Sequence, residues 1–210
     1  MKKMIIGATL LLSVISVNAQ KKGLQGTWFA TCQFGYQQTK TGDAKSTNTT
    51  VLPIIGNFIS PNVAIGIAVG STSMKSETGS TVNANTGLLV VQPLVRKYWN
   101  VSGGLFFFGQ LAVPFIDGKE KQSELKINQV GLSASGGFDM VLGKHFTAEL
   151  SYNLANFSIT TLTPKVGEKT TITDFSLAHV ANVDPIYNGV LKGSNPTLTT
   201  PLSFGFKFLF

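Results

Sequence analysis

The clearest pattern in the chain is a strict alternation of residue types close to its end. Phenylalanine occupies every second position from Phe204 to Phe210, with Gly205, Lys207 and Leu209 between them. Successive side chains of a β-strand point to opposite faces, so the segment predicts a strand with one face of almost pure phenylalanine. Such a face suits a strand that contacts lipid, or one that lines a protein core.

The same alternation recurs through the chain, in residues 28–36, 63–69, 130–142 and 146–154. Three further segments alternate less regularly, and one of them contains Pro53, which weakens a strand ladder. Together the segments predict eight strands of about 10 residues, a length typical of transmembrane barrels. The predicted strands lie near residues 26–38, 50–59, 62–72, 86–98, 103–115, 125–142, 145–159 and 197–210.

The predicted connections alternate in length along the chain. Long loops are expected at 39–49, 73–85, 116–124 and 160–196, and short turns at 60–61, 99–102 and 143–144. Short turns on one side and long loops on the other are typical of outer-membrane barrels. The predicted fold class is therefore all-β, an eight-stranded antiparallel up-and-down transmembrane β-barrel with both ends on the periplasmic side. The alternative is a soluble lipocalin-like barrel, which would turn Phe204, Phe206 and Phe208 inward.

The first residues have the three parts of a secretory signal peptide. Lys2 and Lys3 are followed by an apolar stretch to Val17, and Val17-Asn18-Ala19 is a small-residue cleavage pattern. A permanent anchor is the rival interpretation, but the apolar stretch is shorter than the roughly 20 residues that a spanning helix needs. The predicted organisation is a signal peptide at 1–19 and an outer-membrane β-barrel domain at 20–210, with a long surface loop at 160–196.

Composition supports a surface that water does not fully cover. Charged residues make up 13% of the chain, against roughly 25% in ordinary soluble domains. The net charge of +7 falls to +5 without Lys2 and Lys3. The remaining lysines are scattered, with no dense basic run, so nucleic-acid binding is not expected. Cys32 is the single cysteine, which excludes an internal disulfide.

Several motifs resemble those of the small outer-membrane β-barrel domain family, the OmpA/OmpX-like, porin-type proteins. Residues 57–66 resemble its strand–turn–strand hallmark, residues 92–98 its proline-arginine-aromatic strand, and residues 143–149 its penultimate hairpin. Phe210 resembles the aromatic residue that the barrel-assembly machinery reads, which implies an assembly signal. The resemblance spans the mature chain and implies a fold and a location but no catalytic residue. The loop at 160–196 is longer than compact members of the family need.

Four ionisable residues are predicted to point into the barrel. Arg96, Asp139, Glu149 and Lys207 each fall on the inward positions of their strands, a few residues from the periplasmic end. Asp139, Glu149 and Lys207 belong to neighbouring strands, and Arg96 would approach across the narrow lumen. One hypothesis is a path for protons or ions. The favoured one is a structural network, because charges in a tight lumen must pair to offset their desolvation.

The sequence offers little for catalysis or for metal binding. Asp174, Ser176 and His179 lie close in sequence, but a catalytic triad is recognised by geometry, and an enzyme is not expected. The histidines and Cys32 lack metal-ligand spacing, and the glycine pairs precede no helix, so no catalytic, cofactor-binding or metal site is predicted and no cofactor is expected. The apolar residues within 160–196 favour a contact surface there.

The function expected from these patterns is that of an integral protein of the cell outer membrane with a structural or surface-interaction role, in adhesion or recognition. A small pore or a carrier for small or hydrophobic solutes is the alternative, and a membrane-embedded hydrolase is a weaker one. The expected partners are outer-membrane lipid, the barrel-assembly machinery, and an extracellular ligand or surface partner at 160–196. The protein is expected to be a monomer.

Overall fold

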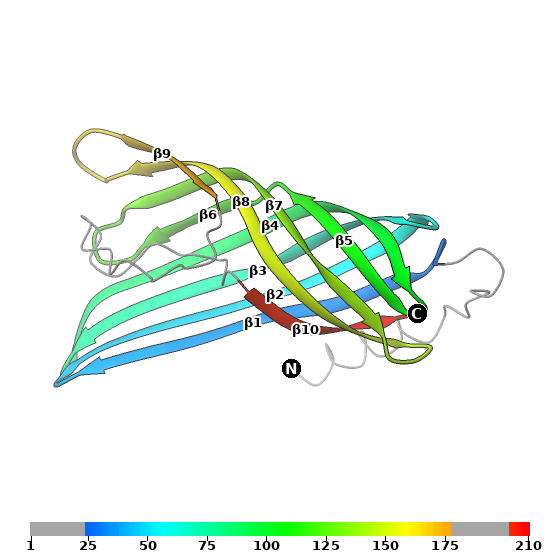
Figure 1. The fold of residues 1–210 in the computed structure, drawn as a ribbon. Coiled ribbons are helices and arrows are strands. Elements are labelled where there is room, and N and C mark those ends of the chain that lie inside the picture. The colour runs from blue at the N-terminus through cyan, green and yellow to red at the C-terminus, as the bar shows by residue number, and fades with distance from the viewer. Residues whose placement is uncertain (1–23, 178–201) are drawn as a thin grey trace, which may run out of the picture.

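The computed structural model describes residues 24–177 and 202–210, which form one antiparallel β-sheet closed into a barrel (Figure 1). The signal peptide predicted at 1–19 lies outside the described residues. Within them, no helix is long and apolar enough to cross a membrane. The strands are β1 (Trp28–Thr41), β2 (Ala44–Ser60), β3 (Val63–Thr78), β4 (Thr81–Ser102), β5 (Leu105–Ala112), β6 (Phe115–Glu120), β7 (Lys126–Val141), β8 (Phe146–Thr163), β9 (Thr170–Leu177) and β10 (Leu202–Leu209).

These ten strands occupy eight positions around the barrel. Strands β5 and β6 both pair with β4 on one side and with β7 on the other, so they are two halves of one position. The interruption falls at Pro114, which has no N–H for a ladder, and its carbonyl accepts from Gly131 N–H at 2.9 Å. Strands β9 and β10 likewise pair with the upper and lower halves of β8. The predicted eight-stranded antiparallel barrel is confirmed at this level.

The barrel closes where the first and last strands meet. Phe29 pairs with Leu209 and Ala30 with Phe208, and this two-residue register is the whole of the β1–β10 pairing among the described residues. Next to it, the backbones of Trp28 and Phe210 exchange two hydrogen bonds, of 2.8 and 2.9 Å. Closure therefore depends on a short stretch at the end of the barrel that carries the turns at 61–62, 103–104 and 142–145.

The outer face of the barrel is apolar. Phe204 is 67% exposed and Phe206 59% exposed, while Lys207, the residue after Phe206, is buried. The inward-facing arrangement of a lipocalin-like barrel is therefore wrong for this chain. On β4 the outward residues from Leu89 to Trp99 are apolar except for Lys97, and they span about 26 Å along the barrel axis for a strand tilted by roughly 40°. That height matches the apolar band of a transmembrane barrel, roughly 25 Å.

The loops predicted at 39–49 and 73–85 are wrong, because both segments are paired strands. Strands β1 and β2 stay in register up to Thr41 and Ala44, and β3 and β4 up to Thr78 and Thr81. Two-residue turns join them, each with a glycine at φ +58°, Gly42 and Gly79. Threonine and serine dominate these segments, and threonine in particular favours strands. The wall of the barrel thus continues well beyond the apolar band.

Part of the loop predicted at 160–196 is also strand. Residues 160–163 complete β8, and Thr170–Leu177 return along it as β9, joined by a turn at 164–169. Figure 1 shows this hairpin at the end of the barrel opposite the C-terminus. The rest of the predicted loop, 178–196, lies outside the described residues.

Candidate functional site: an ion cluster across the lumen

The structure brings the four predicted inward ionisable residues together. Arg96 comes from β4, Asp139 from β7, Glu149 from β8 and Lys207 from β10, so one cluster joins four of the eight barrel positions. The strand registers explain the meeting. Asp139 lies directly opposite Glu149, and Lys207 lies opposite Thr147, two residues along β8 from Glu149.

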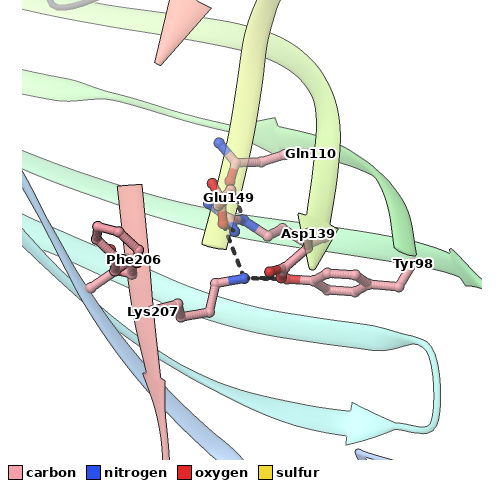
Figure 2. Close-up of polar contacts among 8 residues, drawn as sticks. Tyr98, Gln110, Asp139, Glu149, Phe206 and Lys207 are labelled. Atoms are coloured by element: carbon pink, nitrogen blue, oxygen red, sulfur yellow. Dashed lines mark hydrogen bonds and ion pairs between the residues drawn. The ribbon is translucent and has the colours of Figure 1, made fainter. Parts of the chain in front are cut away.

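Lys207 and Arg96 share the two carboxylates. The Lys207 ammonium group forms ion pairs with Asp139 and, at 3.0 Å, with Glu149 Oε2 (Figure 2). The same Glu149 oxygen accepts from Arg96 Nη1 at 2.5 Å. Two positive and two negative groups therefore form a cluster with no formal net charge. Lys207 is 1% exposed, Arg96 3% and Asp139 4%, so this balance is needed to offset the loss of hydration.

Two polar neighbours complete the cluster and were not singled out from the sequence. Gln110 lies opposite Arg96 on β5 and accepts a hydrogen bond from Arg96 Nε at 2.5 Å. Tyr98 accepts a hydrogen bond from Lys207 Nζ through its hydroxyl group at 3.1 Å (Figure 2). The period of two was the available signal for Tyr98, because a residue two positions after Arg96 on the same strand must also point inward.

Aromatic rings pack around both cations. The Arg96 guanidinium lies 4.8 Å from the centroid of the Phe108 ring, and Lys207 Nζ lies 5.4 Å from that of Phe29. Phe29 and Phe108 are both fully buried. A cation over an aromatic face is stabilised by the ring quadrupole, the more so when water is excluded. Rings and ion pairs therefore lie together inside the barrel at this level, where the interior of an eight-stranded barrel is expected to be filled by side chains.

The cluster depends strongly on Lys207. Asp139 Oδ2 contacts the lysine, whereas Asp139 Oδ1 is buried and has no hydrogen-bond partner in the described part of the chain. The same holds for the hydroxyl of Thr147 beside it. The arrangement can hold four strands in register, but it presents no group with free access to a substrate.

Within the described residues, the other residues considered from the sequence do not come together in a site. Asp174 and Ser176 lie on β9 with both side chains exposed, and His179 lies outside the described residues. His145, at the β7–β8 turn, places Nδ1 3.0 Å from the Leu209 carbonyl and stacks on Phe208. Cys32 is exposed on β1. Among residues 24–177 and 202–210, no three His, Cys, Asp or Glu side chains could hold a metal ion together.

At the far end of the barrel, Glu120 organises the turn after β6. Its carboxylate accepts from the backbone N–H groups of Asn85 and Gln122, both at 3.0 Å, and from the N–H and hydroxyl of Ser123 at 2.5 Å. Desolvation opposes ionisation, but these hydrogen bonds outweigh it and lower the pKa of Glu120 to about 2. Glu120 is therefore engaged in shaping its own turn.

Comparisons with known proteins give a likeness of fold. No family model matches the chain, and no curated protein matches it. Among solved structures, the outer membrane protein OprG from Pseudomonas aeruginosa is similar, with a TM-score of 0.46 and 14% identity over 90% of this chain and 98% of that one. The strand order, closure and outward apolar face described above are those of a small eight-stranded antiparallel barrel of the outer-membrane type.

Proposed function

We propose that the protein is a non-catalytic integral barrel of the outer membrane that does not conduct solutes. It acts through its projecting wall, the part of the strands that extends beyond the membrane. The observation that carries this proposal is the buried ion cluster. It lies buried across the lumen near the end that holds the chain closure, with every charge paired. If the ion cluster closes the lumen, the surface that projects beyond the membrane is the part of the barrel that can bind a partner.

The outer surface supports insertion in a membrane in one orientation. Exposed aromatic residues gather at the closure end, where an interfacial girdle is expected: Trp28, Trp99, Phe107, Phe138 and Phe146. Above the apolar band, outward residues become polar, with Ser71 and Ser73 followed by Lys75 and Glu77 on β3. Strands that enter water beyond the band form a rigid surface for adhesion or recognition, and the exposed tip of the β8–β9 hairpin adds Val166 to it.

Cysteine labelling in intact cells tests location and orientation. In a Cys32→Ser background, Asp43→Cys and Ser80→Cys place a thiol in the turns of the projecting wall, and Lys144→Cys places one at the opposite end. A membrane-impermeant maleimide should label the first two in intact cells and the third only after the outer membrane is permeabilised. Labelling of Lys144→Cys alone in intact cells would reverse the orientation, and a freely soluble mature protein would overturn the proposal.

Planar-bilayer conductance tests the sealed lumen. The purified full-length protein should give no discrete steps. Reproducible steps that persist when residues 178–196 are deleted would favour the alternative, a small pore. Loss of cell-surface binding on the same deletion would instead place the interaction in that segment.

A further inference from the structure

A groove of about 360 Å³ lies on the outside of the barrel, across β4, β6, β7 and β8. Most of its apolar lining lies on outward positions of the strands, namely Leu89, Val91, Phe115, Val130 and Ile159, and the inward Ile116 and Gln129 also contribute. Asp117, Asn128 and Thr161 line its upper part, and Asn128 Nδ2 donates to Asp117 Oδ2 at 3.0 Å. The groove thus lies at the boundary between the apolar band and the polar surface.

Directly above the groove, two lysines face each other. Lys119 on β6 pairs in register with Lys126 on β7. Both lie on the outward face, two residues beyond Asp117 and Asn128 respectively, and both are exposed. Residues directly opposite on antiparallel strands have Cβ atoms roughly 5 Å apart, and like charges there are destabilising. Such a pair is stabilised when an anion lies between the two ammonium groups.

The acidic side chains nearby leave this pair uncompensated. Glu120 binds its own turn, and Glu124 pairs with Lys165 at 2.9 Å. Asp117 accepts from Asn128, and no ion pair within 4 Å joins it to Lys119 or Lys126 in the described part of the chain. Because Asp117 would repel an anion in the groove itself, an anionic group would sit above it, at the lysines.

Space beside the lysines is open. The residue opposite Lys119 on β4 is Gly87, and a Cβ added there would meet nothing within 4 Å. A headgroup could therefore approach the lysines from the β4 side while a chain attached to it runs down the apolar lining. The apolar groove below and the paired cations above match the chemistry of a lipid whose headgroup carries a phosphate.

We propose that this groove and the Lys119–Lys126 pair bind one phosphate-bearing lipid of the outer leaflet, with an acyl chain along Leu89, Phe115 and Val130 and the phosphate between the lysines. The choice of leaflet rests on the proposed function; the site itself depends on the groove and the charges. Binding in detergent micelles therefore tests the site independently of the labelling experiment that tests orientation.

Native mass spectrometry of the full-length protein in a neutral detergent, titrated with dimyristoyl phosphatidic acid or dimyristoyl phosphatidylcholine, measures the binding. One phosphatidic acid should bind in preference to phosphatidylcholine. Lys119→Gln with Lys126→Gln should weaken phosphatidic acid binding about 25-fold, taking each lysine at roughly fivefold. Lys97→Gln with Lys144→Gln, the same charge change near the other end, should leave it within about twofold.

A groove-filling variant separates the chain from the headgroup. Val130→Trp, at a position already 42% exposed to the lipid side, should weaken binding of dimyristoyl phosphatidic acid but not of inorganic phosphate. Equal affinity of the double glutamine variant and the unmodified protein would overturn the proposal, as would equal loss in the control pair. Competition by inorganic phosphate at the lipid's own concentration would overturn the lipid assignment, because it would leave a phosphate ion site alone.

Discussion

Replacing Lys207 with methionine tests whether the ion cluster stabilises the barrel. Methionine is also long and unbranched but lacks the ammonium group, which contacts Asp139, Glu149 and Tyr98. Glu149 retains Arg96 at 2.5 Å, whereas Asp139 loses its ion-pair partner while only 4% exposed. Leaving one charge of a buried pair unmatched costs roughly 3–5 kcal/mol, and we expect the free energy of unfolding to fall by about that amount.

Urea unfolding in lipid vesicles, followed by tryptophan fluorescence and by the heat-dependent gel shift, measures this loss. Lys207→Met with Asp139→Leu removes one charge of each sign, leaves the Arg96–Glu149 pair intact, and should recover at least half of the lost stability. Lys45→Met is the control, since that lysine is 40% exposed in a 3.7 Å ion pair and should change stability by less than about 1 kcal/mol. The reasoning is refuted if Lys207→Met matches the unmodified protein, or if the double variant is less stable than the single one.

Three further predictions concern assembly, packing and pH. Phe210→Ala removes the predicted assembly signal but keeps the backbone hydrogen bonds to Trp28. The amount of assembled barrel in cells, measured by heat-dependent gel shift, should therefore fall, while the stability of the refolded protein should change little. Equal loss in both would argue against an assembly signal. Gly137→Ala should lower the free energy of unfolding in urea by roughly 1–3 kcal/mol, because the added Cβ would meet the Leu150 carbonyl and Ser151 Cα. Gly205→Ala is the control and should leave the free energy of unfolding unchanged, since a Cβ there meets nothing within 4 Å. Because the pKa of Glu120 is lowered from 4.5 to about 2, its stabilisation of the turn is complete above about pH 4.5 and lost towards pH 2. Amide exchange at Gln122 and Ser123, corrected for intrinsic pH effects, should therefore show lower protection at pH 2 than at pH 6. The Glu120→Gln variant should abolish that difference.

The faces of the strands could be predicted from the sequence because the alternation has a period of two and each face meets a different environment. Lys207 alternates with phenylalanines, so it points inward if the phenylalanines contact lipid. Arg96, Asp139 and Glu149 were predicted to point inward by the same alternation. Strand ends could not be predicted in this way. Beyond the apolar band the outward side chains of β2 and β3 are polar, and most of the inward ones are polar too, apart from the buried Met74. A residue such as Thr47 therefore alternates with nothing apolar. Tight turns at Gly42 and Gly79 were therefore mistaken for parts of long loops.

The groove could not be predicted because it depends on register between strands distant in sequence. Lys119 and Lys126 lie close along the chain, and an alternation pattern shows that each is outward. Only the pairing of β6 with β7 makes them direct neighbours, and only β4 and β8 supply the rest of the lining. The register of β7 is the same on both sides of Pro114, which divides β5 from β6.

Charged residues are arranged differently inside the barrel and on its outer surface. Inside, two cations and two carboxylates pair within contact distance, so the cluster carries no net charge that would draw an ion into the lumen. Opening a path would require those pairs to separate in a low-dielectric interior, which the two buried cations make unfavourable. Outside, Lys119 and Lys126 have no such partners in the described chain. In the function we propose, the outer wall attracts a molecule with negative charge at the edge of the apolar band, and the packed lumen gives that wall rigid support.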